Sequence, residues 1–133
     1  MPKFSLVLGA LLGGFAVALG AFGAHRLQRM TGDEVIHRSF QTAVQYQMYH
    51  ALALLAVGVL LLRQTTRFLR SAAICFVAGV LLFSGSLYAI TILKMNGCDI
   101  PTALALLTPA GGIFFIAGWV SLLVSFLWLK RSE

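Results

Sequence analysis

Charged residues divide the chain into four long apolar stretches. Uncharged segments lie between Lys3 and Arg26, between Arg38 and Arg63, between Arg70 and Lys94, and between Asp99 and Lys130. A helix needs roughly 20 residues to cross about 30 Å of hydrocarbon. The pattern therefore predicts four transmembrane helices in one domain of residues 1–133, over about residues 4–25, 33–62, 70–94 and 102–129.

The segments between the predicted helices are short. Short connections favour antiparallel neighbours, so we expect an all-α integral membrane protein, a four-helix up-down-up-down transmembrane bundle.

Thr31 and Glu34 have the spacing of a capping box, which predicts that Thr31 caps the start of the second helix. Pro109 lies inside the fourth stretch, and because proline lacks a backbone N–H it predicts a break in the last helix.

The composition supports a membrane location. Only 11% of the residues are charged, whereas a soluble domain carries about 25%. Basic residues are not clustered on one polar face, so we expect no nucleic-acid partner.

The basic residues on the side of the termini are Lys3, Arg63, Arg67, Arg70, Lys130 and Arg131, and those on the other side are Arg26, Arg29, Arg38 and Lys94. Positive residues are enriched in cytoplasmic loops, so both termini are predicted to be cytoplasmic.

Small residues recur along one face of the first predicted helix. They are spaced by three or four positions: Gly9, Gly13, Ala16, Gly20 and Gly23. Lipid tails supply no hydrophobic force between helices, so membrane helices associate where small residues let their backbones approach closely. This face is therefore predicted to pack against another helix, either within the chain or in an oligomer.

Polar residues of the second, third and fourth stretches fall at similar depths when helical rise is counted from the cytoplasmic charges. They form a predicted polar cluster in the outer half of the membrane: Tyr46, Gln47, His50, Ser84, Ser86, Tyr88 and Thr108. Unpaired polar groups are costly in hydrocarbon, so these side chains are expected to hydrogen-bond one another around a small cavity. The cluster is then either a structural plug or a binding site.

His50 is the intramembrane residue that titrates near neutral pH. It is interpreted either as a proton relay, ligand or general base, or as a neutral imidazole bonded to a neighbouring helix. His25, Arg26 and Arg29 follow the first stretch. They are predicted to stand at the rim of the cluster, where they either bind lipid headgroup phosphates or act as interfacial anchors.

Acidic residues are confined to the predicted loops and the chain end: Asp33, Glu34, Asp99 and Glu133. Coupled transporters usually hold a carboxylate near mid-membrane, and metal sites need several carboxylate, His or Cys ligands. The two cysteines, Cys75 and Cys98, are too few for a disulfide framework. We therefore expect no catalytic residue, no metal site and no cofactor.

Several short motifs occur in order along the chain. They are LGAFGAHRL (19–27), YQMYH (46–50), LFSGSLY (82–88), TPAGG (108–112) and AGW (117–119). Together they resemble the YgdD/YwdK family of small bacterial inner-membrane proteins. The resemblance implies four transmembrane helices, a bacterial cytoplasmic membrane and no established biochemical activity.

These observations predict a non-enzymatic multi-pass membrane protein that acts as an accessory, lipid-interacting or scaffold component. Membrane lipid is its expected partner, with a second copy or another membrane protein as further candidates. The alternative is a small oligomeric pore or solute facilitator, because a single four-helix bundle is filled by its own side chains.

Overall fold

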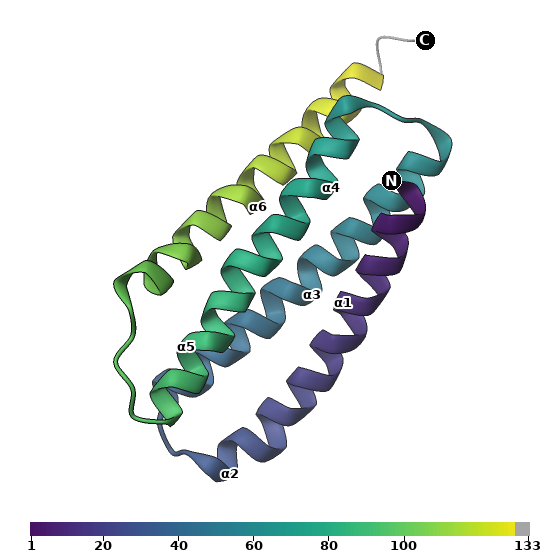
Figure 1. Ribbon diagram of the computed structural model, residues 1–133. Coiled ribbons are helices and arrows are strands. Elements are labelled where there is room, and N and C mark those ends of the chain that lie inside the picture. The colour runs from purple at the N-terminus through teal and green to yellow at the C-terminus, as the bar shows by residue number, and fades with distance from the viewer. Residues whose placement is uncertain (130–133) are drawn as a thin grey trace.

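The computed structural model describes residues 1–129, and every element in that part of the chain is a helix (Figure 1). The first membrane-spanning segment, Pro2–Met30, contains α1 (Pro2–Phe22), the π-helix η1 (Gly23–Leu27) and α2 (Gln28–Met30). The second segment is α3 (Glu34–Arg63), a continuous α-helix of 30 residues. Each of the two is long and apolar enough to cross a membrane.

The second half of the chain repeats this arrangement. The third segment, Arg67–Met95, contains α4 (Arg67–Gly79), the π-helix η2 (Val80–Ser84) and α5 (Gly85–Met95). The last segment is α6 (Thr102–Leu129). The fold is therefore an all-α four-helix membrane bundle.

Helices that are neighbours in the chain are neighbours in space. The first segment packs along α3, α3 packs against α4, η2 and α5, and α6 packs against α4 and η2. Figure 1 shows the segments side by side in this order, with the start of α1 and the end of α6 at the same end of the bundle. The up-down-up-down order thus leaves α1 and α6 on opposite sides of the central pair.

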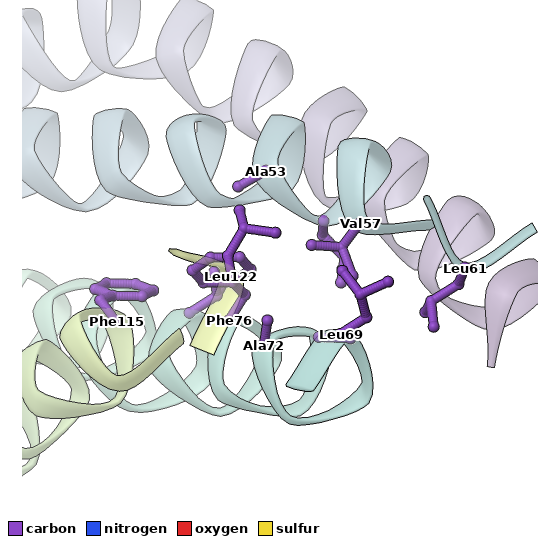
Figure 2. Packing of buried hydrophobic residues seen from close by; sticks show 11 residues of the cluster. Ala53, Val57, Leu61, Leu69, Ala72, Phe76, Phe115 and Leu122 are labelled. Atoms are coloured by element: carbon purple, nitrogen blue, oxygen red, sulfur yellow. The ribbon is translucent and has the colours of Figure 1, made fainter. Parts of the chain in front are cut away.

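The larger hydrophobic core joins the C-terminal half of α3 to α4 and α6. Figure 2 shows Ala53, Val57 and Leu61 of α3 facing Leu69, Ala72 and Phe76 of α4, with Phe115 and Leu122 of α6 completing the cluster. Small and large side chains alternate across this contact, which lets the helices approach closely. Dispersion between well-fitted surfaces stabilises such contacts in lipid, where burial from water gives no gain.

Four glycines of the first segment, Gly9, Gly13, Gly20 and Gly23, face α3, and two of them allow a very close approach. A Cβ atom on Gly9 would lie 2.9 Å from Cγ of Leu55, and one on Gly23 would lie 2.7 Å from Cε1 of Phe40. The contacts at Gly13 and Gly20 are looser, at 3.9 and 3.4 Å. The small-residue face therefore packs within the chain, and Gly9 and Gly23 are its tightest points.

The start of α3 differs from the capping box that the sequence suggested. Asp33 is the N-cap residue, and its Oδ1 accepts a hydrogen bond from the backbone N–H of Val35 at 2.8 Å. The Thr31 hydroxyl oxygen instead accepts from the N–H of Asp33 at 3.2 Å. Both residue types are strong caps and both backbones are extended here, but α3 begins at Glu34, so Asp33 is the residue directly before the first helical turn.

The break expected near Pro109 is absent, because α6 continues as one helix from Thr102 to Leu129 with Pro109 inside it. A membrane helix tolerates an internal proline when neighbouring helices and hydroxyl side chains support the altered backbone. Here Thr108, directly before the proline, is hydrogen-bonded to Ser86 of α5. This cross-helix contact holds the proline-containing turn against its neighbour.

Candidate functional site

His50 lies in the interior of the bundle, where only 4% of its surface is exposed. Its Nδ1 is 2.7 Å from the backbone carbonyl oxygen of Tyr46, which can only accept a hydrogen bond. Its Nε2 accepts the indole N–H of Trp119 at 3.2 Å. The ring therefore carries its hydrogen on Nδ1 and is the neutral tautomer, with both nitrogens engaged.

Aromatic rings enclose the His50 imidazole. The Phe115 ring stacks on it with centroids 3.5 Å apart and planes inclined by 8°. Phe76 and Trp119 approach at centroid distances of 5.5 and 6.1 Å. His50 of α3 is thus held against α4 and α6 by one hydrogen bond from Trp119 and several ring contacts.

Gln47 links three helical segments. Its side-chain N–H donates to the backbone carbonyl of Leu12 in α1 at 2.8 Å, and its carbonyl oxygen accepts from the Tyr88 hydroxyl in α5 at 2.8 Å. Only 4% of the Gln47 surface is exposed. A buried amide has both donor and acceptor capacity to satisfy, and in this position each side of it meets a different helix.

Two serines complete the connections. The Ser84 hydroxyl in η2 donates to the backbone carbonyl of Ala43 in α3 at 2.8 Å. The Ser86 hydroxyl of α5 is 2.6 Å from the Thr108 hydroxyl of α6. Hydrogen bonds therefore link α3 to α1, η2, α5 and α6. A further hydrogen bond links α5 to α6.

Two pairs of the predicted polar cluster bond to each other, Gln47 to Tyr88 and Ser86 to Thr108, whereas the side chains of His50 and Ser84 form their interhelical bonds to residues outside it. Tyr46 contributes its backbone carbonyl to His50, and its ring stacks on Phe83 with centroids 4.6 Å apart. The other six predicted residues, Gln47, His50, Ser84, Ser86, Tyr88 and Thr108, each form a side-chain hydrogen bond to another helix. This arrangement stabilises the bundle, since in hydrocarbon these polar groups need partners within the protein.

A groove of about 630 Å³ lies beside His50, between α3 and α6. We call it the aromatic groove, and it is lined by Tyr46, Tyr49, His50, Phe83, Pro109, Gly112, Ile113, Phe115, Ile116 and Trp119. Tyr49, Ile113, Ile116 and Trp119 are about half to two-thirds exposed, so the groove opens on the outside of the bundle. Its walls are mainly aromatic and aliphatic.

A second groove of about 660 Å³ separates the end of the first segment from α5. We call it the outer groove, and it is lined by Leu19, Phe22, Leu27, Met30, Phe40, Tyr88, Thr91, Ile92, Met95 and Asn96. Thr91 is 3% exposed, and its hydroxyl oxygen is buried without a hydrogen-bond partner among the described residues. An unpartnered buried hydroxyl is unusual, because burial removes its hydrogen bonds to water.

The predicted rim of basic residues lies away from the aromatic groove. His25 and Arg26 are in η1 and Arg29 is in α2, and all three are exposed. None of them lines the aromatic groove, because the first segment packs on α3 whereas that groove lies between α3 and α6. Arg29 directly precedes Met30, which lines the outer groove.

Comparison with known proteins identifies the family. The family described as "Protein of unknown function (DUF423)" matches residues 19–112, most of the chain. The chain belongs to the DUF423 family. The UPF0382 inner membrane protein YgdD of Escherichia coli K12 is 37% identical to it over 98% of this chain and 94% of its own length.

Other relatives extend the same similarity. A UPF0382 membrane protein of Haemophilus influenzae is 41% identical over 92% of each chain. The UPF0382 membrane protein YwdK of Bacillus subtilis is 37% identical over 92% of this chain and 95% of its own length. No solved structure matches the chain. This DUF423 protein is thus a multi-pass membrane protein from a family without an assigned activity.

Sequence reasoning missed two residues of this DUF423 chain. Trp119 was not among the predicted polar residues, although it lies about 16 Å from Lys130 by helical rise and His50 lies about 20 Å from Arg63. That match in depth was the available signal for their hydrogen bond. Thr91 gave no signal, because threonine is common in membrane helices and its unpartnered state appears only when its neighbours are known.

Proposed function

We propose that this DUF423 protein is a non-enzymatic, lipid-interacting component of the bacterial inner membrane, and that the aromatic groove holds a lipid acyl chain. The names of the relatives in Escherichia coli support the membrane assignment. The engaged nitrogens of His50 support a structural role for this residue. A general base needs a nitrogen within hydrogen-bond reach of the proton that it removes, and here both nitrogens already have partners within the protein.

The observation that carries the proposal is the form of the aromatic groove. Its volume of about 630 Å³ lies in the range of small-molecule sites, and aromatic and aliphatic side chains make up most of its walls. The groove lies at the level of the membrane helices and opens sideways, where acyl chains are the neighbouring molecules. An acyl chain fills such a groove without leaving buried polar groups unpaired.

The proposed orientation places both termini in the cytoplasm. Lys3, Arg63, Arg67 and Arg70 lie at the end of the bundle where α1 begins and α3 meets α4. Lys130 and Arg131, which add to the same side, lie outside the described residues. The excess of basic residues at this end supports a cytoplasmic location by the positive-inside rule.

Gly112 provides a direct test of the aromatic groove. It lines the groove, and a Cβ atom at this position would meet nothing within 4 Å, so Gly112→Leu adds a side chain at the groove without a collision at its Cβ. Gly14 in α1 is also open to its surroundings but lines neither groove, which makes Gly14→Leu the matched control. Native mass spectrometry of the protein purified from membranes should detect a retained lipid in the wild type and in Gly14→Leu.

Gly112→Leu should lose that lipid. Equal lipid retention in Gly112→Leu and the wild type would contradict the acyl-chain site. A dimer that Gly112→Leu abolishes, without any change in lipid retention, would assign the groove to a second copy of the chain and overturn the proposal.

A further inference from the structure

We propose that the outer groove binds one phospholipid with an anionic headgroup, and that Thr91 and Lys94 of α5 contact its ester and phosphate groups. The inference rests on the lipid-interacting part of the proposed function, but it concerns a different groove and a different part of the lipid. The two grooves lie on separate sides of α3 and share no lining residue.

The unpartnered Thr91 hydroxyl is the first observation. Thr91 lines the outer groove and is 97% buried, yet its oxygen has no hydrogen-bond partner among the described residues. A buried hydroxyl without a partner costs stability unless a ligand or water supplies one. The surrounding walls are apolar, with Phe22 and Ile92 exposed at the edge of the groove. A lipid ester carbonyl is an acceptor that enters such a groove together with its acyl chains.

The spacing along α5 is the second observation. Tyr88, Thr91, Ile92 and Met95 line the groove with helical spacing, so they share one face. Lys94 is three residues beyond Thr91, about 4.5 Å farther toward the outer surface along the helix axis. The headgroup region of a bilayer extends about 5–7 Å beyond the hydrocarbon on each side. Lys94 is therefore placed at the phosphate level when Thr91 is at the ester level.

Charge at the mouth of the groove is the third observation. Arg29 directly precedes Met30 and Lys94 directly precedes Met95, and both methionines line the groove. One basic residue on each wall therefore lies at the level of this end of the groove, and neither is part of its lining. Asp33 at the same end of the bundle accepts the N–H of Val35, which engages its carboxylate as a helix cap. Cations at a membrane surface attract anionic headgroups.

Thr91→Val tests the hydroxyl, because valine has nearly the same shape and no hydrogen-bonding group. Phosphatidylglycerol is added to the full-length protein in detergent, and the bound lipid is counted by native mass spectrometry. The variant should bind phosphatidylglycerol about 2- to 10-fold more weakly than the wild type. Thr42→Val is the matched control, because the Thr42 hydroxyl is exposed and bonds to the carbonyl of Arg38. It should bind as the wild type does.

Lys94→Gln tests the phosphate contact. It should reduce the preference for phosphatidylglycerol over phosphatidylethanolamine several-fold, because only the former carries a net negative charge. Thermal unfolding gives a second measurement: without added lipid, Thr91→Val should unfold at a higher temperature than the wild type, and phosphatidylglycerol should raise its unfolding temperature less.

Several results would overturn the outer-groove site. One is unchanged phosphatidylglycerol affinity in Thr91→Val, and another is an unchanged headgroup preference in Lys94→Gln. A dimer that Thr91→Val weakens but phosphatidylglycerol does not displace would assign the groove to a second copy. Gly112→Leu separates the two proposals, since it should leave phosphatidylglycerol binding at the outer groove unchanged even where it removes the lipid of the aromatic groove.

Discussion

The indole N–H of Trp119 donates a hydrogen bond to Nε2 of His50, and this bond joins α6 to α3 across 3.2 Å. The two side chains do not lie on helices that pack extensively on each other, since α6 packs mainly against α4 and η2. The bond therefore links the second and fourth membrane segments, each of which packs against the third. It places a polar link beside the aromatic groove, where both residues are part of the wall.

Trp119→Phe should destabilise the protein by about 1–3 kcal/mol, because it leaves the buried Nε2 of His50 without a donor. Thermal unfolding in detergent measures the change. Trp128→Phe is the control, since Trp128 is 56% exposed and forms no hydrogen bond among the described residues. The interpretation of His50 fails if both variants lose the same small amount of stability.

Gln47 and Tyr88 should show coupled energetics. Tyr88→Phe removes the donor to the Gln47 side-chain oxygen, and Gln47→Met removes the amide that also donates to Leu12. Each single variant should cost about 1–3 kcal/mol, because it leaves a buried partner unsatisfied. The double variant should cost less than the sum of the two, by about 0.5 kcal/mol or more. Strict additivity in a double-mutant cycle would mean that the bond contributes little.

Adjacent glycines of α6 should respond in opposite ways to the same substitution. A Cβ atom on Gly111 would collide with the backbone nitrogen of Phe83 in η2, whereas one on Gly112 would meet nothing within 4 Å. Gly111→Ala should therefore destabilise the contact between α6 and η2 by about 1–3 kcal/mol. Gly112→Ala should be neutral or stabilising by up to about 1 kcal/mol, because alanine favours a helix. Unfolding curves that rank the two variants the other way would contradict the packing of α6 described above.

Cys98 provides a natural probe of orientation. It is a free, exposed thiol between α5 and α6, at the end opposite the termini, whereas Cys75 lies within α4. If both termini are cytoplasmic, Cys98 lies on the outer side of the inner membrane. A membrane-impermeant maleimide that can reach this side should then label Cys98 while the inner membrane is intact. Cys98→Ser should abolish the labelling. Labelling that requires disruption of the inner membrane would reverse the proposed orientation.

The sequence predicted the membrane segments well, because charges mark their ends and hydrocarbon thickness fixes their length. The polar residues could be grouped for a related reason: helical rise converts sequence position into depth, and partners must lie at similar depth. Depth does not say which side of a helix a residue occupies. The sequence therefore could not show that the first segment, with His25 and Arg26, packs on one side of α3 while the aromatic groove lies on another.

Local details were harder to predict where two residues compete for one role. Thr31 and Asp33 are both good caps, and Asp33 takes the role because the first helical turn begins at Glu34. The continuity of α6 through Pro109 depends on its neighbours, since the bond between Thr108 and Ser86 comes from another helix. The unpartnered Thr91 hydroxyl likewise depends on which side chains surround it, and this information appears only in three dimensions.

The π-helix η2 has a consequence for how the third segment tolerates mutation. A π turn holds one more residue than the α turn that it replaces, so it rotates the faces of α4 and α5 relative to each other by about 100°. Phe76 and Tyr88, on either side of it, both reach α3 or its partners because of that rotation. Deleting a single residue within Val80–Ser84 would restore a regular helix while turning one half of the segment away from its contacts. The length of this turn therefore sets the rotation of α4 relative to α5 about their common axis.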